Sequence, residues 1–182
     1  TDVVTFADIE QLANKADIEF LATRYVVTGT SDTTFEPNKS ITRAQFGVMI
    51  ARALNLTPTT ETYYADTKGQ WYEADIQALY EAGITNAPGN FNPGATLSRE
   101  HAAVFMHRVM SYIQKENVPA ATATAYADQE KINASYAEAI ATLNSLGIMQ
   151  GKEGNVFDPK GNLTRGQMAK VLRKTLEAID MM

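Results

Sequence analysis

The sequence repeats one short pattern three times, and this repetition constrains the fold more than any other feature. Each copy opens with an aromatic residue, alanine and aspartate: Phe6-Ala7-Asp8, Tyr64-Ala65-Asp66 and Tyr126-Ala127-Asp128. Each later has a phenylalanine two residues before a proline, at Phe35, Phe91 and Phe157. An arginine follows each phenylalanine by eight residues, at Arg43, Arg99 and Arg165. Ordered markers with a constant interval predict three copies of one module of roughly sixty residues.

Segments rich in threonine, proline and small residues separate the copies. They carry no apolar periodicity, which is typical of linkers. The predicted organisation is a first repeat at 1–56, a linker at 57–62, a second repeat at 63–116, a linker at 117–125 and a third repeat at 126–182.

Two helices are predicted in each copy, and the first has an isoleucine and a leucine three residues apart on one face. These pairs are Ile18 and Leu21, Ile76 and Leu79, and Ile140 and Leu143. The helix ends at a short apolar exit, where glycine supplies the left-handed residue that stops a helix. The exits are Tyr25-Val26-Val27, Gly83-Ile84-Thr85 and Gly147-Ile148-Met149.

The second helix is predicted to begin at the arginine of each copy, after the N-caps Thr42, Ser98 and Thr164. Gln45 and Gln167 complete capping boxes, whereas His101 leaves the box of the second copy incomplete. Apolar residues three, six, seven and eleven positions after each arginine form one stripe that predicts a face against a core. Because one copy buries little surface, we expect the copies to share a core. The expected fold is an all-α, pseudo-threefold bundle of helix-loop-helix repeats with grooves between them.

Composition excludes several classes of function. The net charge of -5 argues against a broad nucleic-acid surface, and no stretch has the roughly 18 apolar residues of a membrane span. The chain opens on TDVVTFAD, so we expect that any export signal has been removed or was never present. Cysteine is absent, which excludes disulfides and thiolate metal sites.

An arginine at the first position of a helix is electrostatically unfavourable unless an anion is expected there, because that end of the helix already carries partial positive charge. A bound anion would meet free backbone N–H groups and a guanidinium that can hold a carboxylate through two bonds. The alternative is that each arginine pairs with the aspartate of an opening triplet, Asp8, Asp66 or Asp128. The residue types alone leave both interpretations open.

Aromatic side chains beside a cation suit sugar binding, because ring faces cover the apolar side of a pyranose. Trp71 and Tyr72 are the candidates, with Tyr63 nearby. Core packing or helix anchoring is the more common role of such residues.

Metal sites and catalysis are not expected. The two histidines, His101 and His107, lie six apart and do not share one helix face. No calcium loop, nucleophile motif or phosphate loop is present. We therefore expect a non-enzymatic protein without metal or cofactor.

The start of the second helix resembles the Ile-Thr-Arg-Ala-Glu motif of the S-layer homology family. It reads Ile41-Thr42-Arg43-Ala44-Gln45, Leu97-Ser98-Arg99-Glu100-His101 and Leu163-Thr164-Arg165-Gly166-Gln167. The aromatic-x-Asp opening, the Gly-Ile exit and the Phe-x-Pro step of that family are also present. The resemblance covers essentially the whole chain in three tandem copies.

This resemblance implies a non-catalytic, extracellular module that anchors an S-layer protein or exoenzyme to the bacterial cell wall. The implied partner is a secondary cell wall polysaccharide attached to peptidoglycan, bound by a monomeric module at its terminal pyruvylated N-acetylmannosamine. The carboxylate of the pyruvate ketal matches the anion expected at the repeated arginine. The candidate ligand-binding residues are Arg43, Arg99, Arg165, Asp8, Asp66, Asp128, Trp71, Gly29 and Gly151.

Departures from the family pattern predict grooves of unequal strength. No copy has glutamate two residues after the arginine, tryptophan survives only as Trp71, and the second copy lacks the loop glycine seen as Gly29 and Gly151. We expect at least one groove to be weak or empty.

A second basic position, nine residues after each arginine, also repeats as Arg52, Arg108 and Lys174. Nine residues is half a turn out of phase with the arginine, so we expect these side chains to cover an outer face or pair with acids. Contact with polymer beyond its terminal sugar stays open.

Two other functions remain as alternatives. A helical-repeat scaffold for protein–protein contacts needs only the same capped helices and apolar stripes. A wall hydrolase is the less favoured, because a catalytic pair need not recur three times whereas binding sites do.

Overall fold

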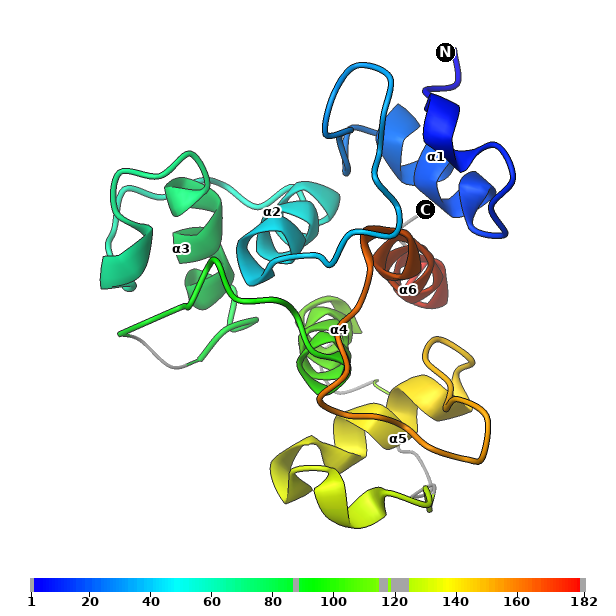
Figure 1. Cartoon of the computed structure of the whole chain (residues 1–182). Coiled ribbons are helices and arrows are strands. Elements are labelled where there is room, and N and C mark those ends of the chain that lie inside the picture. The colour runs from blue at the N-terminus through cyan, green and yellow to red at the C-terminus, as the bar shows by residue number, and fades with distance from the viewer. Residues whose placement is uncertain (1, 87–88, 115–117, 119–124, 181–182) are drawn as a thin grey trace. The chain divides into compact units, whose positions relative to one another are not determined.

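The computed structural model describes residues 2–86, 89–114, 118 and 125–180. Its helices are α1 (Lys15–Thr23), α2 (Arg43–Ala53), α3 (Glu73–Glu81), α4 (Arg99–Gln114), α5 (Ala137–Ser145) and α6 (Arg165–Ala178), shown in Figure 1. Short 3-10 turns are η1 (Ala7–Ile9), η2 (Ala65–Thr67), η4 (Gln129–Lys131) and η5 (Ala134–Tyr136). Over these residues β pairing is limited to isolated bridges. The all-α prediction is therefore confirmed.

The predicted helix starts are correct because side chains cap them. Thr42 and Gln45 form both bonds of a capping box, as do Thr164 and Gln167. In the second copy the Ser98 hydroxyl accepts from the His101 N–H at 3.3 Å. The apolar stripe of each second helix is buried, as predicted.

The first helices all end in the same hydrogen-bonded turn. The N–H of Val26, Ile84 and Ile148 donates to the carbonyl five residues earlier, at 2.9 Å in each case. The residue before it is left-handed: Gly83 has φ 75°, Gly147 has φ 71° and Tyr25 has φ 60°. In the first copy Tyr25 therefore takes the left-handed position at the helix end that glycine occupies in the other two copies.

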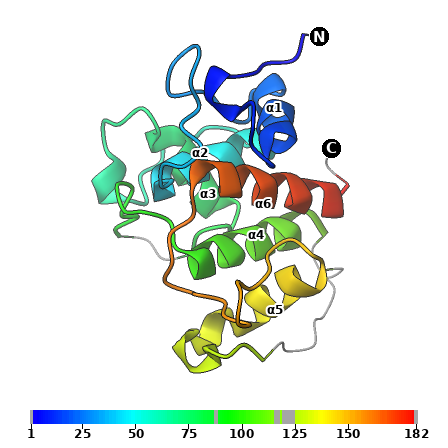
Figure 2. The same ribbon diagram turned by 45° about the vertical axis from the view of Figure 1, so that its right-hand side comes forward.

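Contacts divide the chain into two compact units. The first contains Thr1–Leu97 and Leu163–Arg173, and the second contains Ser98–Asn162 and Lys174–Met182. In the first unit α2 packs on α3, since Gly47 allows close approach: a Cβ there would lie 2.5 Å from Ile76 Cδ1. In the second unit α4 packs on α5, as Figure 2 shows.

A closed ring of backbone hydrogen bonds joins the three copies inside the first unit. Ile41 donates to Leu163, Leu163 donates to Leu97 and Leu97 donates to Ile41, at 3.0, 3.1 and 2.9 Å. All three side chains are buried, and each lies two residues before the repeated arginine of its copy. The ring brings together segments far apart in the sequence, each just before a second helix.

The predicted linker at 57–62 contains no helix. Most of the other predicted linker, 117–125, and the repeat ends at 1, 116 and 182 lie outside the described residues. Within the described part of the chain, no helix is long and apolar enough to cross a membrane.

Candidate binding site

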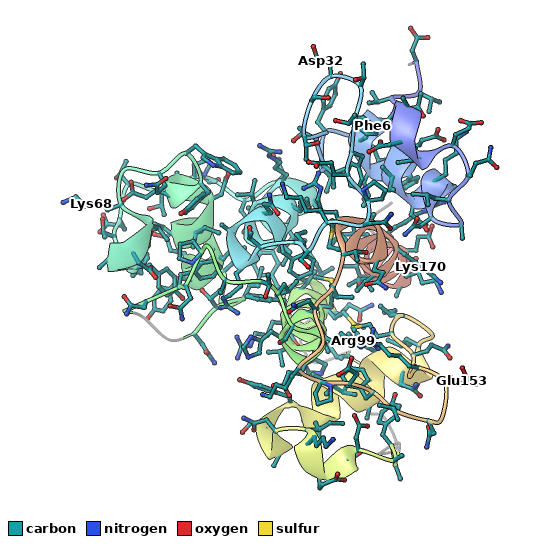
Figure 3. The ribbon with its side chains drawn as sticks, in the orientation of Figure 1. Phe6, Asp32, Lys68, Arg99, Glu153 and Lys170 are labelled. Carbon is teal, nitrogen blue, oxygen red and sulfur yellow. The ribbon has the colours of Figure 1, made fainter. Side chains whose placement is uncertain are left out.

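Each repeated arginine binds the backbone of the loop in another copy. The Nε of Arg43 donates to the Phe91 carbonyl at 2.9 Å, Arg99 to Phe157 at 2.8 Å, and Arg165 to Phe35 at 2.9 Å. The order is cyclic: the first copy binds the second, the second binds the third and the third binds the first. Figure 3 shows Arg99 where α4 meets the loop after α5.

Two of these guanidiniums are buried and have a second carbonyl partner. Nη2 of Arg99 donates to Gln150 at 2.7 Å, and Nη2 of Arg165 donates to Thr28 at 2.9 Å. Arg99 is 8% exposed and Arg165 4%. Burial lowers the pKa of both arginines, and nearby carboxylates oppose that shift. Arginine nevertheless stays charged in proteins, so buried positive charge is held here by carbonyl dipoles.

The phenylalanine of each loop lies between an arginine and the opening aromatic residue. The guanidinium carbons of Arg43, Arg99 and Arg165 lie 4.9, 4.9 and 4.5 Å from the centroids of the rings of Phe91, Phe157 and Phe35. The opening aromatics Tyr64, Tyr126 and Phe6 pack on the same rings at 5.4, 5.3 and 5.4 Å. Cation–π contact thus adds to the carbonyl bond in every copy.

The aspartates of the triplets bind the other side of the same loops. Asp8 accepts from the N–H groups of Phe35 and Glu36 at 2.9 and 2.8 Å. Asp66 does so with Phe91 and Asn92, and Asp128 with Phe157 and Asp158. Among the described residues neither Arg99 nor Arg165 forms an ion pair with these aspartates. Arginine and aspartate therefore bind opposite sides of one peptide segment, and for Arg99 and Arg165 this arrangement replaces the direct pairing considered from the sequence.

The expectation that the helix starts offer free N–H groups to an anion is wrong. The Arg43 and Ala44 N–H groups donate to the carbonyls of Ala95 and Pro93. The first two N–H groups of α4 and of α6 likewise donate to loop carbonyls. Because the loop of another copy occupies these donors, an anion must be recognised by side chains.

One pocket of about 200 Å³ lies in the first unit and brings together three predicted site residues, Gly29, Trp71 and Arg165. This volume is below the roughly 300–1,000 Å³ of sites for drug-sized ligands, so the pocket suits one small unit. Its other lining residues are Thr28, Thr30, Gln45, Val48, Met49 and Arg52.

Arg52, expected from the sequence to cover an outer face or pair with an acid, lines this pocket. It is out of phase with Arg43 of its own copy, as expected, but the arginine in this pocket is Arg165 of the third copy. The sequence does not show the cyclic order of the copies, which brings Arg165 of the third copy beside Arg52 of the first. The corresponding Lys174 is used differently, because its Nζ donates to the Gly147 carbonyl at the end of α5.

The pocket lining combines cationic, aromatic and apolar side chains. Two guanidiniums line it and no carboxylate does. Arg52 is exposed, and Trp71 is 68% exposed with its ring edge-on to Tyr72. Val48 and Met49 are buried and supply apolar surface. Tyr63 lies outside this lining, stacked on Tyr80 and bonded to Glu81.

Of the remaining predicted site residues, Asp8 binds the first loop, and the others lie around the other two loops. Arg43 and Asp66 hold the loop of the second copy, and Arg99 and Asp128 hold that of the third, where Gly151 follows the Gln150 acceptor. Gly29 and Gly151 make room for the opening aromatics, since a Cβ would lie 2.5 Å from Phe6 Cε1 or 2.9 Å from Tyr126 Cε1. The second-copy loop that was noted for lacking this glycine includes residues 87–88, which lie outside the described residues.

Comparison with known proteins identifies one family. The model of the S-layer homology domain matches residues 5–46, 63–103 and 125–169. The chain is 39% identical over 181 residues to amylopullulanase of Thermoanaerobacterium thermosulfurigenes and 37% over 182 residues to Exoglucanase XynX of Acetivibrio thermocellus. It is 33% identical over 161 residues to an S-layer protein of Bacillus thuringiensis subsp. finitimus. These alignments cover 95%, 96% and 87% of this chain but 10%, 16% and 19% of the relatives, so it spans a tenth to a fifth of their length.

Substitution of Gly29 by alanine should destabilise the first loop. The added Cβ would lie 2.4 Å from the Ser31 carbonyl oxygen and 2.5 Å from the Phe6 ring. We expect urea unfolding to show a loss of roughly 1–3 kcal/mol, the usual cost of overpacking. Gly94→Ala is the matched control, since nothing lies within 4 Å of a Cβ there. Equal stability of the two variants would contradict the close approach.

The loop aspartates should make stability depend on pH. Burial acts to raise the pKa of Asp8 and of Asp128, but the backbone N–H donors outweigh it and hold each pKa below its usual value. Their stabilisation is therefore present above the ordinary pKa of about 3.9 and is lost as pH falls through the lower folded value. Asp128→Asn should reduce the fall in unfolding free energy between about pH 4 and pH 2.

The control for this pH dependence is Asp32→Asn, on an exposed loop. Urea unfolding followed by circular dichroism at each pH measures the difference. If the wild type, Asp128→Asn and Asp32→Asn all lost stability in parallel, the aspartate–backbone bonds would not be the source.

Proposed function

Because this chain belongs to the S-layer homology domain family, whose modules anchor S-layer proteins and exoenzymes to the cell wall, we propose that it tethers an attached protein to a wall polymer. The polymer is a secondary cell wall polysaccharide linked to peptidoglycan, and the module acts outside the cell as a monomer. The observation that carries the proposal is the pocket lined by Arg52, Arg165 and Trp71.

The ligand is the terminal pyruvylated N-acetylmannosamine of the polymer. Arg52 binds the ketal carboxylate, because its guanidinium is exposed and no acid lines the pocket. Asp75 lies outside this lining but within range of the Arg52 charge: burial raises the pKa of that carboxyl, and Arg52 opposes the rise. Arg165 already donates to two carbonyls, so it shapes the wall of the pocket and adds positive charge. In the other copies, Arg43 and Arg99 hold the corresponding loops and contribute charge there.

The sugar ring stacks on Trp71, whose exposed indole face suits the apolar side of a pyranose. The hydroxyls of Thr28 and Thr30 and the amide NH2 of Gln45, whose oxygen already accepts from the Thr42 N–H, are the polar groups available to its hydroxyl and acetamido groups. Gly29 lets this loop close over the Phe6 ring and so sets the rim of the pocket.

The module works without catalysis. Glycoside cleavage uses two carboxyl groups across the scissile bond, and the lining of this pocket has none. The relatives named as glycanases extend far beyond the matched region, which covers 10% and 16% of their lengths. We place any activity of a full-length protein in regions outside this module.

A protein–protein scaffold is the alternative that uses the same helices. The cationic pocket with an exposed indole favours the glycan. Isolated wall sacculi with and without their secondary polymer separate the two: anchoring predicts retention of this chain only when the polymer is present. Equal retention on both would contradict glycan anchoring.

Removal of either exposed pocket side chain should weaken binding without unfolding the protein. We expect Arg52→Ala and Trp71→Ala each to lower affinity for pyruvylated N-acetylmannosamine about tenfold to a hundredfold in calorimetry. Lys170→Ala removes one exposed positive charge elsewhere and should change affinity by less than about twofold. If Lys170→Ala lowered affinity for the sugar as much as Arg52→Ala does, the effect of Arg52 would come from net charge and not from contact in the pocket.

Binding stoichiometry should be below three per chain. The pair of Trp71 and Arg52 that lines the described pocket is not repeated at the equivalent positions of the third copy. Ser135 stands where the second copy has Trp71, and Lys174, which corresponds to Arg52, binds a backbone carbonyl. Calorimetry at saturating pyruvylated sugar measures the number of sites. Three sites of equal affinity would contradict the inequality of the copies.

A further inference from the structure

Tyr25 is the one exit residue of a first helix that is not glycine. Gly83 and Gly147 occupy the same hydrogen-bonded turn in the other copies with φ 75° and 71°, and Tyr25 adopts φ 60°. A residue with a Cβ pays free energy for this left-handed conformation, whereas glycine does not. The first copy therefore retains a conformationally unfavourable side chain at a position where the other two have none.

Burial does not compensate for this cost. Tyr25 is 77% exposed. Within the described part of the chain its ring packs on no other ring, and its hydroxyl has no hydrogen bond to a protein group. A strained backbone conformation that no contact within the protein stabilises indicates a role in binding.

The position of Tyr25 relates it to the pocket. Thr28 lines the pocket and lies three residues further along the same segment. Three residues span at most about 11 Å, so the two Cα atoms lie within that distance. Val26 and Val27 between them are each 2% exposed, so burial anchors the short segment that joins the exposed Tyr25 to the pocket residue Thr28.

We propose that Tyr25 is a stacking platform for a second sugar unit of the wall polymer, adjacent to the unit in the pocket. An exposed tyrosine offers a ring face to the C–H groups of a pyranose while its hydroxyl stays in water. This inference rests on the proposed function, which supplies a polymer whose end occupies the pocket. It distinguishes the first copy, because the glycines of the other two have no ring to offer.

The experiment compares two ligands by calorimetry: the pyruvylated monosaccharide, and a polymer fragment of at least two sugars that ends in the same unit. Tyr25→Gly and Tyr25→Asn remove the ring and tolerate the left-handed conformation, so both should keep the wild-type midpoint of urea unfolding or raise it. Tyr25→Phe keeps the ring. Trp71→Ala serves as the pocket variant.

We expect the glycine and asparagine variants to bind the longer fragment about threefold to tenfold more weakly, with unchanged affinity for the monosaccharide. Tyr25→Phe should bind both ligands as the wild type does. Trp71→Ala should weaken both.

Unchanged binding of the fragment by Tyr25→Gly and Tyr25→Asn would overturn this inference and leave the proposed function intact. Equal weakening of both ligands would overturn it as well, because Tyr25 would then act on the first sugar. Failure of the wild type to bind either ligand would overturn the proposed function and this inference with it. A change in self-association alone would assign the ring to a protein contact and also overturn the proposal.

Discussion

The bond from a buried arginine to a loop carbonyl of another copy is the interaction on which the other features depend. A buried guanidinium needs acceptors, and here the carbonyl of a phenylalanine and, for Arg99 and Arg165, a second loop carbonyl supply them. The same loops accept the first N–H groups of the second helices, while the aspartates hold their N–H side. One copy alone would leave the arginine and the helix start without partners. The module therefore folds as a set of interlocked copies, which the closed ring of Ile41, Leu97 and Leu163 also requires.

This interlocking also explains how a repeated structure can carry an unrepeated site. The clamp around Arg165 holds the loop whose residues Thr28, Gly29 and Thr30 line the pocket together with residues of α2. The residues that give the pocket its proposed specificity are outside the clamp. Trp71 and Tyr25 differ between the copies, and neither of them supports the loop, whereas the basic position of Arg52 repeats as Arg108 and Lys174. Repeated residues build the clamp, and in the proposed function the residues that differ determine what each copy binds.

The sequence predicted the helices well because their signals are local. Capping residues adjoin the helix starts, and the apolar stripes repeat with helical period. The partner of the arginine was not predictable, because a spacing of eight residues says nothing about which copy supplies the acceptor. The expectation of free N–H groups at the helix start was wrong for the same reason, because the carbonyls that accept from them belong to another copy. The helical phase of Arg52 relative to Arg43 predicts a different face of α2, but it does not reveal that Arg165 of another copy lines the same pocket as Arg52. Tyr25 was counted as an ordinary helix exit, and its left-handed, exposed conformation became evident only in three dimensions.

The central claim is that the pocket at Arg52 and Trp71 receives the anionic end of a wall polymer. Trp71 is the single tryptophan of the chain and is 68% exposed, so its fluorescence reports on this pocket alone. The most direct measurement is a titration of that emission with pyruvylated N-acetylmannosamine and with the same sugar lacking the ketal. Binding of the carboxylate beside Trp71 predicts a saturable blue shift with the pyruvylated sugar and a much weaker response without its carboxylate. Saturable binding of the pyruvylated sugar with no change in Trp71 emission would contradict it.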